Sequence, residues 1–246
     1  GMDGEEQTVP FGTELLFRCR QLPGLVIGGE VCEDVWMPDS PSIRHALAGA
    51  TVIVNASASD ETTGKDQYRQ SLVESQSAKL VCVYLYASAG EGESTTDLVF
   101  SGHNLIVENG NLLAQSARFR NETTYGDVDL ERIHSERRRM TCFEVSPDPG
   151  YREVYFDLTP EYLSLERQID PAPFVPDNQQ DREKRCEEIL AIQVMGLKKR
   201  LEHTSCSSAV VGISGGLDST LALLVTVRAF DLLGISRQNI QAVTMP

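Results

Sequence analysis

The sequence has no apolar run of the roughly 20 residues that a membrane-spanning helix requires. It also has few basic residues, since 22 Lys and Arg face 36 Asp and Glu, for a formal net charge of −14. A surface this acidic repels phosphate backbones and anionic lipids, so we expect neither nucleic acid nor a membrane as a partner. The first residues are acidic and polar, which is not the pattern of a secretory signal peptide.

Paired cysteines are absent as well. The six cysteines are scattered and form no C-x-x-C pair, which argues against a zinc ribbon and a disulfide scaffold. We therefore expect reduced thiols and a cytoplasmic protein. The four histidines share no ligand spacing, so we predict no metal-ligating residue; they are His45, His103, His134 and His203.

The length of 246 residues suits one large domain or two small ones. Strand and helix patterns alternate over residues 1–144, and Asn109-Gly110 marks a hairpin turn. This pattern predicts an α/β fold with mixed strand pairing. The expected strands are 25–32, 51–55, 80–86, 105–107, 112–113 and 125–129, and the expected helices are 40–49, 66–79 and 130–140.

Residues 145–180 change in character, because six of the eleven prolines fall there. Proline fixes φ and removes a backbone donor, so this stretch is expected to be an extended linker, with one strand-like piece at Glu153–Phe156. A second unit begins at about 181 with an apolar helical pattern. A strand at 209–213, a helix ending at Gly234 and a strand at 240–245 then predict one βαβ unit.

The loop Ser214-Gly215-Gly216-Leu217-Asp218-Ser219 joins that strand to its helix. Two glycines allow close backbone approach, and a helix start favours an anion. The loop lacks the Walker spacing. It resembles the S-G-G-x-D-S loop of the ATP pyrophosphatases, and the alternative is an ordinary glycine-containing turn. Asp218 matches the family's loop aspartate, and the alternative role for it is to cap the helix. The resemblance implies that ATP is contacted by Gly212, Ile213, Ser214, Gly215, Gly216, Leu217, Asp218 and Ser219.

Cys32 stands where an apolar strand meets the polar turn Glu33-Asp34. A thiolate at a strand end is an exposed nucleophile, and neighbouring N–H groups can form an oxyanion hole. The alternative is a small core residue. The segment resembles the nitrilase superfamily, and three later segments fit that family as well: 55–59, 100–110 and 127–130.

A nitrilase-like segment followed by an S-G-G-x-D-S loop resembles the glutamine-dependent NAD synthetase family, as does the segment Ala87–Asp97. The resemblance covers about Val9 to Pro246. It implies the second half of a nitrilase-like αββα sandwich (1–144), the linker (145–180) and the first βαβ unit of a doubly wound parallel-sheet ATP-pyrophosphatase domain (181–246).

The resemblance also implies a ligase chemistry. Cys32 would attack the carboxamide of glutamine, with the Glu33 N–H as oxyanion donor. Ser59 and Lys65 fall where the family contacts glutamine, although the second position is often Arg, which pairs a carboxylate differently. The ammonia would replace AMP on adenylated deamido-NAD to give NAD. ATP and Mg²⁺ are the implied cofactors.

The nitrilase triad also needs a glutamate and a lysine upstream of the cysteine. None of the 31 residues before Cys32 is a lysine, and Glu30 and Glu33 are too close to Cys32 to be the family's base. We therefore expect an internal fragment that is inactive alone and that self-associates as a homo-oligomer through uncovered strand edges and apolar faces. Two alternatives remain: a nitrilase-type amidotransferase for another ATP-activated acceptor, and a non-catalytic binding or assembly module.

Overall fold

The computed structural model describes residues 8–93, 96–146, 148–159, 161 and 164–244. The acidic start at Gly1–Glu6, the residues Ser94 and Thr95 of the family-like segment, and Met245 of the last expected strand lie outside the described residues. The chain divides into two compact units, Gly1–Gln168 and Ile169–Pro246. The predicted domain limits at 144/145 and 180/181 stay predictions.

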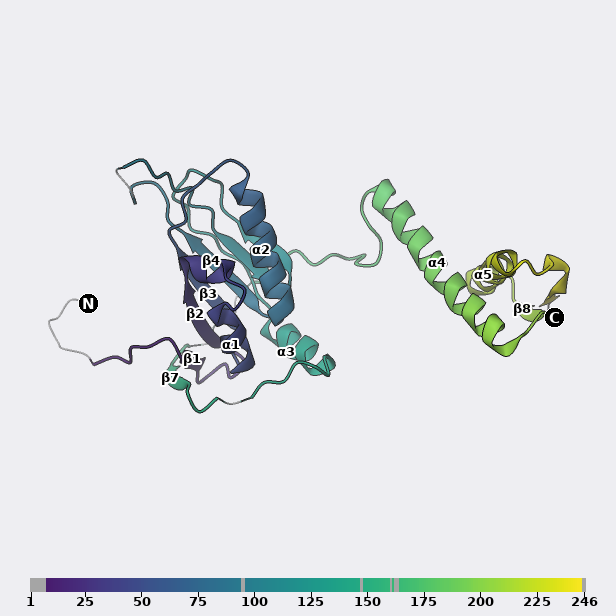
Figure 1. Ribbon diagram of the computed structural model, residues 1–246, viewed down its shortest axis with the longest axis horizontal. Helices are drawn as coiled ribbons and strands as arrows, with labels where there is room; N and C mark the ends of the chain where they lie inside the picture. The colour runs from purple at the N-terminus through teal and green to yellow at the C-terminus, as the bar shows by residue number, and fades with distance from the viewer. Residues whose placement is uncertain (1–7, 94–95, 147, 160, 162–163, 245–246) are drawn as a thin grey trace. The chain divides into compact units, whose positions relative to one another are not determined.

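The first unit is built on a seven-stranded mixed sheet with the order β6-β5-β4-β3-β2-β1-β7 (Figure 1). The pairs β1–β7, β2–β3 and β3–β4 are parallel, and the pairs β1–β2, β4–β5 and β5–β6 are antiparallel. The expected mixed pairing is thus confirmed. The strands are β1 (Leu15–Cys19), β2 (Val26–Val31), β3 (Val52–Ser57), β4 (Val83–Ser88), β5 (Leu105–Glu108), β6 (Asn111–Gln115) and β7 (Arg152–Phe156).

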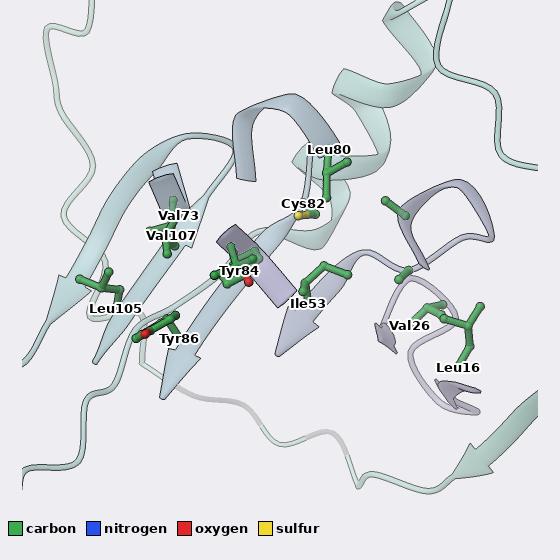
Figure 2. Packing of buried hydrophobic residues seen from close by; sticks show 13 residues of the cluster. Leu16, Val26, Ile53, Val73, Leu80, Cys82, Tyr84, Tyr86, Leu105 and Val107 are labelled. Carbon is green, nitrogen blue, oxygen red and sulfur yellow. The ribbon is translucent and has the colours of Figure 1, made fainter. Parts of the chain in front are cut away.

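Helices cover both faces of this sheet. On one face, helix α1 (Pro41–Leu47) lies against β2 and β3, and helix α2 (Lys65–Leu80) lies against β4 and β5 (Figure 1). The main core lies under them and contains Ile53 and Tyr84, with Val73 and Leu80 from α2 (Figure 2). Side chains alternate along a strand, so Val52 and Val83 face the other way. There they pack with Ile133 of α3 (Leu130–Arg139).

Local signals place most of these elements. Asn109 and Gly110 both have positive φ, 46° and 81°, as a type I′ hairpin turn requires. Helix α1 begins at Pro41 after Ser40, and Gly49 follows it in a left-handed conformation (φ 116°). The strand-like piece at 153–156 is β7, and it pairs with β1. These predicted elements are therefore confirmed.

The strand predicted at residues 125–129 is wrong, because these residues form no strand. The carboxylates in this stretch bind backbone N–H groups instead of leaving the chain free for a ladder. Asp127 Oδ2 accepts from Glu166 N (2.7 Å) and Arg167 N (2.9 Å), and Asp129 Oδ1 caps α3 through Arg132 N (2.9 Å).

Two further elements differ from the prediction. Strand β1 was not expected, and β4 begins only at residue 83 because α2 continues to residue 80.

The second unit consists of α4 (Gln179–Thr204), β8 (Ala209–Ile213), α5 (Leu217–Leu233), the short 3₁₀ helix η2 (Arg237–Asn239) and β9 (Ile240–Thr244). Strands β8 and β9 are parallel, with Ala209 opposite Ile240, so the predicted βαβ unit is confirmed. Its small core lies between α4 and α5 and contains Val194, Ala229 and Phe230. No helix among the described residues of either unit has the length and apolar character needed to cross a membrane.

Candidate active site

Cys32 lies at a sharp turn between β2 and the 3₁₀ helix η1 (Cys32–Trp36). Its φ is +50°, in the left-handed region, which costs a residue other than glycine about 1–3 kcal/mol. The turn is closed by Asp34, whose Oδ2 accepts from Val31 N (2.8 Å). A side chain on such a strand-to-helix elbow is presented at the end of the sheet, and the Cys32 thiol is half-buried there.

Asn55 of the neighbouring strand β3 binds the backbone of Cys32 on both sides. Its Oδ1 accepts from Cys32 N at 3.0 Å, and its Nδ2 lies 3.4 Å from Cys32 O. The same Nδ2 donates to Tyr84 Oη at 3.2 Å, and Tyr84 donates in turn to Glu30. Both carboxylate oxygens of Glu30 are thus hydrogen-bonded, one to Tyr84 and the other to Ser42 N (2.9 Å).

Glu33 follows Cys32 in the first turn of η1 with its side chain exposed. The first N–H groups of a helix have no acceptor within the helix. Because Asn55 already occupies the Cys32 N–H, the Glu33 N–H is the next backbone donor along the turn. Its role as an oxyanion donor stays a prediction.

Lys65 is the first residue of α2, and it lies against η1. Its Nζ is 5.9 Å from the centre of the Trp36 ring, and Trp36 stacks on Tyr68 of α2 at 5.3 Å. The ammonium donates to Asp60 O (2.7 Å) and pairs with Asp60 Oδ1 (3.1 Å), which lowers the pKa of that carboxyl. The structure therefore brings Lys65 to the helix that begins at Cys32.

Ser59 is buried just after β3, whose Ala56 is the register partner of Val31 in β2. The carboxyl ends of neighbouring parallel strands meet at one edge of a sheet, so Ser59 follows the strand beside the elbow. The roles of Ser59 and Lys65 toward glutamine stay predictions.

A second buried polar network surrounds Arg69 of α2. Its guanidinium donates to Glu61 Oε2 and to His103 Nδ1, both at 3.1 Å. Since His103 accepts at Nδ1, its Nε2–H donates to Gln115 Oε1 (3.0 Å). Both ring nitrogens of His103 are thus used by hydrogen bonds within the unit.

The loop of the second unit connects β8 to α5. Gly215 has φ +84°, a conformation that favours glycine, and Gly216 is the N-cap residue of α5. Hydroxyls tighten the turn, because Ser219 Oγ and Thr220 Oγ1 both donate to Gly216 O, at 3.1 and 2.9 Å. The loop is exposed, and the first turn of the 17-residue α5 directs its N–H groups toward it.

The alternative role of Asp218 as a helix cap is wrong. The N-cap position belongs to Gly216, which has no side chain to offer, and Asp218 lies in the first turn with its side chain exposed. A carboxylate there still interacts favourably with the helix dipole. Contact between ATP and residues 212–219 stays a prediction.

Sequence reasoning missed Asn55 and Tyr84 as parts of the elbow. The available signal was an amide inside the β-branched run of β3, at a position that faces the core. An uncharged polar residue in a buried strand needs a partner, and here the partner is the backbone of Cys32. Neither residue type by itself indicates that role.

The carbon–nitrogen hydrolase family model matches residues 3–138, and the NAD synthase model matches residues 189–246. A glutamine-dependent NAD(+) synthetase of Mycobacterium tuberculosis is 43% identical, over 99% of this chain and 38% of that protein. The Mycobacterium leprae enzyme is 44% identical, over 96% of this chain and 36% of that protein. The chain therefore spans under two fifths of the length of these relatives.

Among solved structures, a glutamine-dependent NAD+ synthetase from Acinetobacter baumannii, in complex with adenosine diphosphate, aligns with a TM-score of 0.40 and 22% identity. The alignment covers 91% of this chain and 34% of that one. With the two family matches and the mixed sheet, the expected architecture is confirmed: a nitrilase-like domain followed by the start of an NAD synthase domain. The chain belongs to the carbon–nitrogen hydrolase family, and it joins that family's domain to NAD synthase sequence as glutamine-dependent NAD(+) synthetases do.

Proposed function

We propose that this chain is part of a glutamine-dependent NAD synthetase, which makes NAD from deamido-NAD, ATP and glutamine. One observation carries the proposal: the chain combines a thiol on a left-handed strand-to-helix elbow with a glycine turn at a helix N-terminus. The first lies within the carbon–nitrogen hydrolase match and the second within the NAD synthase match. Relatives at 43–44% identity that share both parts carry this enzyme name.

The first reaction would take place at Cys32. Its thiolate attacks the carboxamide carbon of glutamine, and the oxyanion that forms accepts from the Glu33 N–H. The carbon–nitrogen bond then breaks, ammonia leaves with a proton, and a thioester remains. Water hydrolyses the thioester to glutamate and restores the thiol. Ser59 and Lys65 bind the glutamine, with the Lys65 ammonium exchanging part of its bonding to Asp60 for the substrate.

The second reaction would take place at the loop of residues 212–219. The carboxylate of deamido-NAD attacks the α-phosphorus of ATP, and pyrophosphate leaves. Ammonia then attacks the acyl adenylate, and AMP leaves to give NAD. The loop's contribution is to bind the pyrophosphate part of ATP through the N–H groups of Gly215, Gly216 and the first turn of α5.

Mg²⁺ would enter with ATP. Among the described residues, no three His, Cys, Asp or Glu side chains are placed together to hold a metal ion, so these residues offer no site for a resident metal. Magnesium is commonly held by substrate phosphates together with one or two carboxylates. The ion would therefore be held mainly by the phosphates of ATP.

We also propose that the 246-residue chain has neither activity by itself, because no lysine precedes Cys32 and the nearby Glu30 and Glu33 are too close to be the nitrilase base. All six cysteines are free thiols, which supports a cytoplasmic location.

Exposed apolar side chains, among them Val210, Leu217 and Leu224, support self-association as a homo-oligomer. Light scattering over a range of protein concentrations would test self-association, and a monomer at every concentration would contradict it.

The deciding experiment measures glutamate release from glutamine, first with this chain and then with the full-length protein encoded by its gene, each beside its Cys32→Ala variant. We expect the short chain to release no glutamate, and the full-length protein to release glutamate only when Cys32 is present. The full-length protein is then assayed for product with deamido-NAD and with other carboxylate acceptors. Cys32-dependent hydrolysis by the short chain would contradict its proposed inactivity. A preference for another acceptor would favour the alternative amidotransferase.

A further inference from the structure

The elbow at Cys32 depends on residues that the chemistry above does not use. The left-handed backbone of Cys32 is unfavourable for a cysteine, so neighbouring groups must hold it. Asp34 closes the turn locally, on the side of Val31. The side-chain contacts to Cys32's own backbone come from another strand, through Asn55.

Asn55 is well placed for this task, because it is the register partner of Glu30 in the parallel β2–β3 pair. It therefore lies two residues behind the elbow, and its side chain reaches forward along β2. With Oδ1 on the N–H of Cys32 and Nδ2 toward the carbonyl of Cys32, the amide binds both ends of the strained residue. Asn55 is fully buried, so water does not compete for these bonds.

Tyr84 fixes the orientation of the Asn55 amide. Its hydroxyl accepts from Asn55 Nδ2 (3.2 Å) and donates to Glu30, which directs Oδ1 toward Cys32. Burial and the adjacent Glu30 raise the pKa of Tyr84, so the phenol keeps its proton and can only donate to that carboxylate. Glu30 is anchored at its other oxygen by Ser42 N, at 2.9 Å next to the start of α1.

We propose that Asn55 and Tyr84 are positioning residues for the nucleophile: they hold Cys32 in its left-handed conformation, so that its thiol faces the substrate and the Glu33 N–H stays free for the oxyanion. Neither side chain touches substrate. The occupied Cys32 N–H cannot serve the oxyanion, which leaves that role to the next donor along the turn. The consequence for catalysis rests on the proposed function, whereas the mechanical role at Cys32 does not.

The mechanical role is tested on this chain by hydrogen exchange and by alkylation of Cys32 with iodoacetamide. In Asn55→Ala, we expect amide exchange to rise at least tenfold in the peptide that contains Cys32–Trp36. We expect Cys32 alkylation to slow at least fivefold, because the relaxed backbone turns the thiol toward the core. Tyr84→Phe keeps the ring and should show a smaller change in the same direction. Asn55→Asp keeps the acceptor for Cys32 N and should recover part of the protection.

Ser77→Ala is the matched control. Ser77 is buried in α2 and is similarly bonded to backbone, through Cys82 O (2.7 Å) and Gly110 N (3.2 Å), but it lies away from the elbow. This variant should increase exchange near residues 77–82 and leave Cys32 alkylation unchanged. If Asn55→Ala behaves like Ser77→Ala at Cys32, the proposal is wrong.

The catalytic consequence is tested in the full-length protein as a split between kcat and KM for glutamine. Asn55→Ala should lower kcat at least tenfold while KM stays within threefold, because Ser59 and Lys65 are unchanged. If Asn55→Ala raises amide exchange near Cys32 but leaves kcat unchanged, Asn55 has only a structural role and the positioning role is wrong. If the unmutated full-length protein does not hydrolyse glutamine, the proposed function fails, and the exchange and alkylation results still decide whether Asn55 holds Cys32.

Discussion

Arg167 and Glu108 form a two-pronged ion pair, with Arg167 Nη1 at 2.8 Å from Glu108 Oε2 and Nη2 at 2.7 Å from Oε1. Glu108 ends β5 and is 1% exposed, whereas Arg167 lies 59 residues later, within the proline-rich stretch. The pair therefore binds the end of the first unit to its central sheet. Hydrogen bonds to a charged group are stronger than neutral ones, and without Arg167 the buried Glu108 keeps the N–H of Asp129 (2.6 Å) but loses its close cation.

Arg167→Ala should lower the free energy of unfolding of the first unit by about 1–3 kcal/mol, since Glu108 loses its two-pronged partner. Urea denaturation followed by circular dichroism measures this. Arg132→Ala is the control, because Arg132 approaches the same carboxylate at 3.8 Å and is 47% exposed. It should change stability by less than about 0.5 kcal/mol. Equal losses in the two variants would contradict the special role of Arg167.

His45 should make the first unit less stable in mild acid. Its Nε2–H donates to Gly29 O (2.9 Å), and its Nδ1 accepts from Tyr151 Oη (2.8 Å), so the native ring is neutral. Burial lowers the pKa of His45 below 6.5, more than the neighbouring carboxylates of Glu30, Glu14 and Asp34 raise it. The unfolded chain thus takes up the proton first, and stability is lost as the pH falls below 6.5 toward the native pKa.

Unfolding free energies measured from pH about 7.5 to about 5.5 test this dependence. Relative to the unmutated chain, His45→Gln should be less stable at neutral pH and should lose less stability across that interval. His134→Gln changes an exposed histidine and should leave the pH dependence as it was. An unchanged slope in His45→Gln would show that other groups cause the acid sensitivity.

Gly215 and Gly196 should respond to alanine in opposite directions. A Cβ has open space at both positions, so only the backbone differs. Gly215 has φ +84°, and Gly215→Ala should destabilise the second unit by about 1 kcal/mol. Gly196 lies inside α4, where Ala is the better helix former, and Gly196→Ala should stabilise the unit by about 0.5–1 kcal/mol.

The same pair tests the proposed ATP site. Gly215→Ala should weaken ATP binding by the full-length protein about tenfold, or about 1.4 kcal/mol, because the turn can no longer present its N–H groups. Calorimetric titration with ATP measures this, and Gly196→Ala should bind as the unmutated protein does. Unchanged binding by a folded Gly215→Ala protein would argue against this loop as the phosphate site.

Within the predicted linker of 145–180, chymotrypsin should cut at Phe174 well before Tyr155. Tyr155 is part of β7 and pairs with Arg18 of β1, so its backbone is held in the sheet. Phe174 is 85% exposed and lies outside any helix or strand. Mass spectrometry of early fragments identifies the cut. Initial cleavage at Tyr155 would mean that β7 opens readily and that the flexible connection begins earlier.

The outcome for β7 shows where sequence reasoning reached its limit. The strand-like pattern at 153–156 predicted extended structure, and the prolines around it predicted a linker. Both signals are local. The partner of β7 is β1, which was not expected and lies more than 130 residues earlier, and the bridge Arg18–Glu153 spans 135 residues. Pairing at that distance leaves no periodic trace in either segment.

Residues 125–129 illustrate the opposite error. The sequence predicted a strand here, but Asp129 caps α3 through Arg132 N, and Asp127 accepts from the N–H groups of Glu166 and Arg167, 39 and 40 residues later. Side-chain acceptors of this kind compete with a β-ladder, and the targets of Asp127 reach it only after the chain has folded. The pattern alone therefore could not exclude a loop.

The sequence by itself determined the elements that depend on neighbours along the chain. Apolar runs, Asn109-Gly110, Ser40-Pro41 and the six-residue loop at 214–219 each specify a strand, turn or helix start through local backbone preferences. The sequence also carried the resemblance that placed Cys32 on a strand end. What only the tertiary structure decided is how that cysteine is held. Its left-handed backbone is bound by Asn55, 23 residues away, and Asn55 is oriented by Tyr84, because parallel strands bring side chains together that are distant in the chain.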